Sequence, residues 1–216
     1  MLWQARSAPV PSFTPITEAI EQARKAWFAR KSGAVFFCDA SDVVTAGAPG
    51  NNTLIIQSLI QHAQGLTTLV AMRDPWLIDK LQHQEVGDEV DVMLGGHLMP
   101  DLYPAIAIQA TLTFQGESHG FGRAIVLRQG SIHICVTESS PGVMKAEFYQ
   151  QLGLSVWKAD IVVVKNLFPW RLFCALYNRK SIYVQTQGVT DLDAAKVLNF
   201  NRNLYPFDRS VADWKV

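Results

Sequence analysis

A short apolar run that leads through a loop into a helical pattern is the feature that most limits how this chain can fold. Residues 34–38 read Ala-Val-Phe-Phe-Cys, which is typical of a strand buried on both faces. The loop after them is rich in glycine, proline and asparagine, and a pattern with helical spacing begins at Leu54. Asn52 or Thr53 is placed to cap the free amides of that helix. In an open α/β sheet, this exit from a core strand lies at the edge where ligands bind.

The same alternation recurs along the chain and predicts parallel strands joined by crossover helices. The other expected helices begin at Thr14-Pro15, where proline suits the first helical position, at Asp74-Pro75 and at Phe168. The expected strands and helices of these units are 53–64 (helix), 67–72 (strand), 75–82 (helix), 161–164 (strand), 168–179 (helix) and 181–186 (strand).

A stretch with a different period interrupts this pattern. Residues 106–114 alternate between apolar and polar, which predicts a half-buried strand, and residues 115–122 read as a turn-rich loop. Residues 124–127 and 132–136 flank Gln129-Gly130 and predict a hairpin. We therefore expect one α/β domain over residues 1–216 of three-layer type, with a mixed sheet, crossover helices and an antiparallel hairpin insertion. Residues 1–13 are expected to form an extended arm.

Composition excludes several classes of function. Lysine plus arginine and aspartate plus glutamate each number 19, so the net charge is zero and the basic footprint of a nucleic-acid-binding protein is absent. The sequence has neither an apolar run of 18 residues, which a membrane span requires, nor the apolar core of a signal peptide near its beginning. The three cysteines are far apart in sequence and read as reduced thiols, which predicts a cytoplasmic protein.

Two aspartates and one lysine are the first candidates for chemistry. Asp39 and Asp42 follow the strand 34–38, and Lys165 follows the strand 161–164. If these strands are parallel, all three side chains emerge at one edge of the sheet. The aspartates could bind a cation, hold a lysine or a catalytic base, or cap the following turn, and Asp is frequent in turns for that last reason. Lys165 could neutralise a substrate carboxylate or one of the two aspartates.

The amides near Gly50 and at the start of the helix offer a place for an anion, because free N–H groups and the helix dipole point there. The spacing matches neither a P-loop nor a dinucleotide-binding fingerprint. The five histidines lack the spacing of a metal site, so no metal ligand and no complete catalytic set is expected in this chain.

A set of motifs in a fixed order gives the chain a resemblance to the C-terminal half of the MlrC family, which is named for hydrolases that act on linearised microcystin. The matching stretches are 39–53, Gly95-Gly96-His97, 148–153, 162–165 together with Arg171, 186–190 and 204–208. The sequence departs from the family pattern at 43–46, at Asn51, which replaces an aspartate, and at Pro169, which replaces a histidine. The resemblance implies that zinc is bound in an N-terminal domain that this chain does not include.

The resemblance favours the non-zinc half of a metallohydrolase that cleaves peptide or amide bonds, which binds substrate or completes the site of a zinc-domain partner. The alternatives are a stand-alone module that binds a small anion or a peptide, and a structural or assembly domain. Homo-oligomers are compatible with each of these hypotheses. The candidate substrate-binding residues are Asp39, Asp42, Gly47, Gly50, Asn51, Asn52, Thr53, Lys165 and Arg171.

Overall fold

A computed structural model describes residues 12–191, which form strands and short helices around one sheet. In chain order the elements are β1 (Thr14–Pro15), α1 (Ile16–Lys25), α2 (Trp27–Arg30), β2 (Ala34–Asp39), η2 (Val44–Ala46), α3 (Thr53–His62), β3 (Thr68–Arg73), α4 (Pro75–Leu81), β4 (Glu89–Leu94), β5 (Ile106–Ser118), β6 (Gly122–Gln129), β7 (Ile132–Thr137), α5 (Glu147–Gln151), η3 (Val156–Lys158), β8 (Ile161–Val164), α6 (Trp170–Phe173) and β9 (Asn178–Gln185). Residues 1–11 of the expected N-terminal arm lie outside this range.

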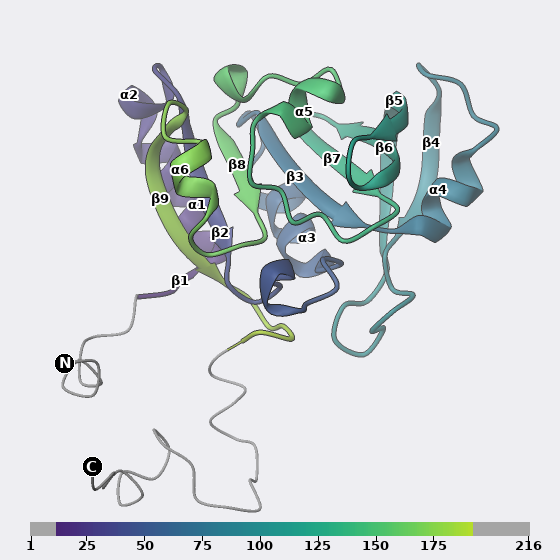
Figure 1. Cartoon of the computed structure of the whole chain (residues 1–216), viewed down its shortest axis with the longest axis horizontal. Helices are drawn as coiled ribbons and strands as arrows, with labels where there is room; N and C mark the ends of the chain where they lie inside the picture. The colour runs from purple at the N-terminus through teal and green to yellow at the C-terminus, as the bar shows by residue number, and fades with distance from the viewer. Residues whose placement is uncertain (1–11, 192–216) are drawn as a thin grey trace, which may run out of the picture.

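The sheet has nine strands in the order β1-β9-β2-β8-β3-β7-β6-β5-β4 (Figure 1). The first six strands of this order pair in parallel, and β7, β6, β5 and β4 continue as an antiparallel meander. The predicted mixed α/β fold is therefore confirmed, with its crossover helices and its antiparallel insertion. Because β2 and β8 run in parallel, the residues that follow them emerge at one edge of the sheet.

Helices cover both faces of the sheet, which makes the three layers. One apolar core contains side chains of α1, α3 and α4 packed on the sheet, and a second contains side chains of α5, η3 and α6 on the opposite face. Figure 1 shows α5 and α6 in front of the sheet and α3 behind it. The central strands β2 and β8 are buried along their whole length, as the apolar runs predict. Within residues 12–191, no helix is both long and apolar enough to cross a membrane.

The helix starts follow from capping side chains. The side-chain oxygen of Asn52 accepts a hydrogen bond from the Leu54 amide (2.9 Å), and Asp74 accepts one from Leu77 (3.1 Å). Each satisfies an amide that has no partner inside the helix. The predictions for 53–64 and 75–82 are thus confirmed to within two residues.

The expected helix over 168–179 is wrong in extent, because α6 spans only Trp170–Phe173. The helix closes in a turn in which the amides of Tyr177 and Asn178 both donate to the Cys174 carbonyl. The Tyr177 carbonyl then accepts from Ala34 (2.8 Å), and β9 begins its pairing with β2 at Asn178. Strand pairing across the sheet therefore overrides the local apolar pattern.

Two further expectations need correction, and two elements were missed. Residues 115–118 belong to β5 rather than to a loop, because they pair with 122–125 in the hairpin. Thr14–Pro15 pairs with β9, so α1 starts one residue after the proline. The strand β4 and the helix α5 were not expected from the sequence.

Candidate functional site

Asp39, Asp42 and Lys165 meet at the edge where parallel strands end. Asp39 is the last residue of β2, and Lys165 directly follows β8, its neighbour in the sheet. The Nζ atom of Lys165 lies 2.9 Å from Oδ2 of Asp39 and 2.9 Å from Oδ2 of Asp42. The predicted convergence of these side chains is confirmed. We call these three residues the buried charge cluster.

All three side chains are closed off from solvent, with exposed fractions of 0%, 0% and 1%. Burial raises the pKa of Asp39, the Asp42 charge adds to that rise, and Lys165 opposes it. Burial alone would lower the pKa of Lys165, but the two carboxylates outweigh burial and raise it. Two carboxylates thus share one ammonium group, and burial makes Asp39 hold a proton more readily than an ordinary aspartate does.

The amides that we expected to receive an anion bind a carboxylate of the chain itself. Gly50 donates its amide to Oδ1 of Asp42, and Asn52 donates its amide to Oδ2, both at 2.9 Å. Asp39 receives a weaker bond from the Ser41 amide at 3.2 Å. Asp42 therefore accepts three charge-assisted or backbone bonds and fixes the loop that leads into α3.

Among the other predicted residues of the loop between β2 and α3, some are buried and one is exposed. The side-chain amide of Asn52 donates to Thr186 Oγ1 (2.8 Å), and the Thr53 hydroxyl donates to the Pro104 carbonyl (2.8 Å). Asn51 is also buried, and its Oδ1 has no hydrogen-bond partner among the described residues. Gly47 is exposed at the tip of the loop and takes a φ of 95°, a left-handed conformation that suits glycine.

Hydroxyl groups that the sequence reasoning missed join this loop to its neighbours. The hydroxyl of Tyr103 donates to the Ser41 carbonyl (3.3 Å) and accepts from the Val189 amide (3.1 Å). The Ser41 hydroxyl donates to the Thr186 carbonyl (2.7 Å), and the Thr190 hydroxyl donates to Ala40 (2.9 Å). Ser41, Thr186 and Thr190 lie in stretches that match the family pattern but were not singled out, whereas the lone Tyr103 carries no spacing signal and only the fold could identify it.

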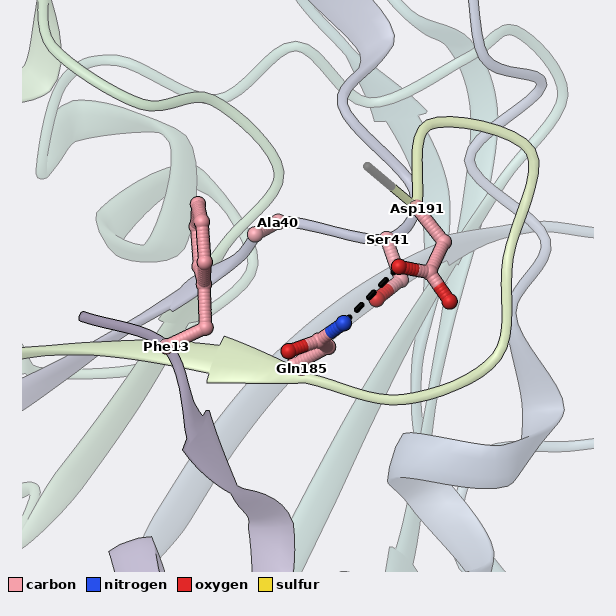
Figure 2. A pocket seen from close by; sticks show the side chains of 5 residues that line it. All are labelled: Phe13, Ala40, Ser41, Gln185 and Asp191. Atoms are coloured by element: carbon pink, nitrogen blue, oxygen red, sulfur yellow. Dashed lines mark hydrogen bonds between the residues drawn. The ribbon is translucent and has the colours of Figure 1, made fainter. Parts of the chain in front are cut away.

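The space beside the buried charge cluster is very small. A cavity of about 10 Å³ is lined by Phe13, Ala40, Ser41, Gln185 and Asp191 (Figure 2). Figure 2 also shows the hydrogen bond from Gln185 to Asp191, which is 2.8 Å long. That volume is close to the minimum for one water molecule. In this conformation the cavity is too small for a peptide side chain.

Arg171 lies apart from the cluster. It is exposed on α6, and its guanidinium sits over the ring of Tyr183 at 5.3 Å from the ring centroid. Hydrogen bonds and ion pairs found in residues 12–191 do not connect it to Asp39, Asp42 or Lys165. The structure thus brings eight of the nine predicted residues to one loop and strand edge and leaves Arg171 on the neighbouring surface.

The zinc that the family resemblance implies does not fit the part of the chain that the structure describes. No group of three or more His, Cys, Asp or Glu side chains in that part could hold a metal ion. The two carboxylates of the cluster are already bound by Lys165 and by backbone amides. A zinc ion would have to displace a buried ammonium group to reach them.

Comparison with known proteins gives a family and a fold. The family described as MlrC C-terminus matches residues 37–202. A crystal structure of a candidate metallopeptidase from Mesorhizobium sp. BNC1 superposes with a TM-score of 0.80 at 23% sequence identity, over 96% of this chain and 43% of that one. This chain thus spans less than half the length of that protein, and no curated protein matches it. The match over residues 37–202 covers most of the sequence, and the chain belongs to the MlrC C-terminus family.

Proposed function

We propose that this chain is the non-zinc, substrate-binding or completing domain of an MlrC-like metallohydrolase that cleaves peptide or amide bonds. The family match carries the proposal. It is supported by the fold shared with a candidate metallopeptidase that is more than twice as long as the matched region. The additional length of that protein is where a zinc-bearing domain would be found, and we propose such a domain as the partner of this chain.

The buried charge cluster would act by positioning. Its three side chains are sealed from solvent and cannot touch a substrate while the fold is closed. They do fix the backbone between Asp39 and Asn52, and that segment presents the exposed tip at Thr45–Gly47 on the edge where α/β proteins bind ligands. We assign substrate contact to Gly47 and to Arg171, whose guanidinium can pair with a carboxylate.

The chemistry of bond cleavage would come from the partner. The residues that would hold zinc lie in that partner, where the metal would supply Lewis-acid chemistry and an activated water. This chain would orient the substrate with its rigid edge and exclude water by covering the partner domain. A cytoplasmic location is part of the proposal, and the three buried free thiols support it.

The test pairs the chain with a zinc domain. We propose to co-express it with the part of the Mesorhizobium protein that this chain does not cover, and to measure zinc-dependent hydrolysis of a panel of linear peptides. A gain in rate over that zinc domain alone, lost in the Arg171→Ala variant, is the expected result. The proposal would be overturned if the two proteins formed no stable complex and the rate did not increase.

Burial of the cluster also favours a second function, an assembly domain without catalysis. In that case the cluster only stabilises the edge of the sheet. Asp39→Ala would then lower stability and leave every binding property of the folded protein unchanged, whereas a positioning role predicts weaker substrate binding at temperatures where the variant is fully folded. The two outcomes separate the two functions.

A further inference from the structure

One side of the molecule exposes an unusual concentration of large apolar side chains. Leu172 is 80% exposed and Leu176 is 73% exposed, and Phe168 and Phe173 beside them are also exposed. Met144 is exposed as well, and its carbonyl accepts a bond from the thiol of Cys174, so it adjoins the same segment. We call Phe168, Leu172, Phe173, Leu176 and Met144 the α6 surface. Four of these five residues lie in or next to α6 in the sequence, and Figure 1 shows where α6 lies in the fold.

A groove continues this surface toward the β5–β6 turn. It has a volume of about 340 Å³, and Phe121, Val143, Met144 and Phe148 form its apolar lining. Met144 belongs to both the groove and the α6 surface, and Lys145 connects them because its Nζ lies 5.3 Å from the centroid of the Phe173 ring. An apolar ridge beside a groove of this size is the arrangement in which a partner inserts an anchoring side chain.

The charges around the α6 surface are mostly positive. Lys145 lies over the Phe173 ring, Glu147 lines the groove and Arg171 belongs to α6 itself. Two more exposed cations flank Tyr177, the residue after Leu176: Lys158 follows Trp157, whose ring contacts Tyr177, and Arg179 is two residues further along the chain. Four of these five are cations, although the chain as a whole is neutral. Such a rim attracts an acidic partner and disfavours a basic one.

This charge pattern decides between the possible occupants. In a symmetric dimer the same patch meets its own copy, so the four cations would face four cations. The ends of the chain are not acidic either, because residues 192–216 contain three aspartates and four lysines or arginines, and residues 1–11 contain one arginine and no acidic residue. The observations favour a separate protein surface that is apolar at its centre and acidic around it.

We propose that the α6 surface and its groove are the docking site for an acidic, apolar face of the zinc-bearing partner domain. This inference rests on the proposed function and adds where the partner binds and what chemistry its face has. Docking there would also cover Arg171, which we assigned to substrate contact, and would bring it to the junction between the two domains.

The experiment compares two matched substitutions. Leu172→Glu places a carboxylate on the α6 surface, and Val86→Glu makes the same change at an apolar side chain that is 60% exposed between α4 and β4. Each variant is co-expressed with the uncovered part of the Mesorhizobium protein, and its affinity and mass are measured by titration and light scattering. Both variants should unfold at the same urea concentration as the wild type, because both sites are exposed.

The expected result is a one-to-one complex whose affinity falls about tenfold or more in Leu172→Glu and is unchanged in Val86→Glu. A complex that tolerates Leu172→Glu would overturn the docking site and leave the proposed function standing. If the wild-type chain formed no complex, both the docking site and the proposed function would be overturned. A wild-type dimer that Leu172→Glu converts to a monomer would show that a second copy is the occupant, and it would also overturn the inference.

Discussion

Two neighbouring regions of this molecule reverse the usual distribution of side chains. In the buried charge cluster, Lys165 is 1% exposed, whereas Leu172 on the nearby α6 surface is 80% exposed. Folded proteins place lysine outside and leucine inside far more often. The cluster compensates for its burial within the chain, through ion pairs and backbone amides. The exposed apolar side chains of the α6 surface, in contrast, are not covered by other described residues. The two regions therefore call for different tests.

Removing the ammonium group should have the largest effect. Lys165→Met leaves two carboxylates buried against each other, and we expect a loss of about 3–5 kcal/mol in the free energy of unfolding. Urea unfolding measures it, with Lys158→Met at an exposed position as the matched control. A loss below about 1 kcal/mol, equal to that of the control, would mean that the cluster contributes little to stability.

The two aspartates should differ in their contributions. Asp42→Asn can accept only one of the two amide bonds from Gly50 and Asn52, and it leaves the other amide buried without a partner. Asp39→Asn removes a charge that the cluster holds in excess. We therefore expect Asp42→Asn to cost about 1–3 kcal/mol more than Asp39→Asn in urea unfolding. Equal costs would contradict the distinction.

Stability should also depend on pH through Asp39. Its pKa is raised in the folded state from a usual value of 3.8, mainly by burial. The folded state therefore binds a proton more tightly than the unfolded chain, so this contribution is present at low pH and declines as pH rises above about 4. The difference in unfolding free energy between wild type and Asp39→Asn isolates it, because each tenfold difference in proton affinity between the folded and unfolded states is worth about 1.4 kcal/mol. We expect the unfolding free energy of the wild type to fall relative to that of Asp39→Asn as pH rises; a wild type that gains stability relative to the variant with rising pH would refute the assigned direction.

The smallest effect is expected on the α6 side. Arg171→Ala removes the contacts of an exposed guanidinium with the rings of Tyr183 and Trp170, at 5.3 and 6.0 Å from the ring centroids, so the loss in unfolding free energy should be about 0.5–1 kcal/mol. Thermal unfolding measures it against Arg179→Ala. A loss above about 2 kcal/mol would show that Arg171 contributes to the core, in contrast to the surface role proposed for it.

The edge of the sheet was predicted well because the spacing of apolar residues and the helix-capping residues are local signals. The strand over 34–38 and the cap at Asn52 followed from patterns within a few residues, and the convergence of Asp39 with Lys165 followed once the two strands were taken to be parallel. What failed depended on distant partners. Whether residues 174–179 end a helix depends on β9 pairing with β2, and whether 115–118 form a strand depends on the partner strand β6.

Burial was the second quantity that the sequence could not provide. Asp39, Asp42 and Lys165 read equally well as an open ligand site and as an internal ion pair, because spacing does not report solvent access. Likewise the pattern over 168–179 predicted a helix without reporting its exposure, and Leu172 and Leu176 are among the most exposed apolar side chains described. Both results depend on how whole layers pack.

Amide hydrogen exchange at Gly50 and Asn52 tests most directly whether Asp42 is the anion that holds this loop. We predict that these two amides exchange only when the whole wild-type domain unfolds, and that Lys165→Met lets them exchange through local opening while α3 stays protected. Rapid exchange of both amides in the wild type, or equally slow exchange in Lys165→Met, would contradict a loop held closed by the buried charge cluster.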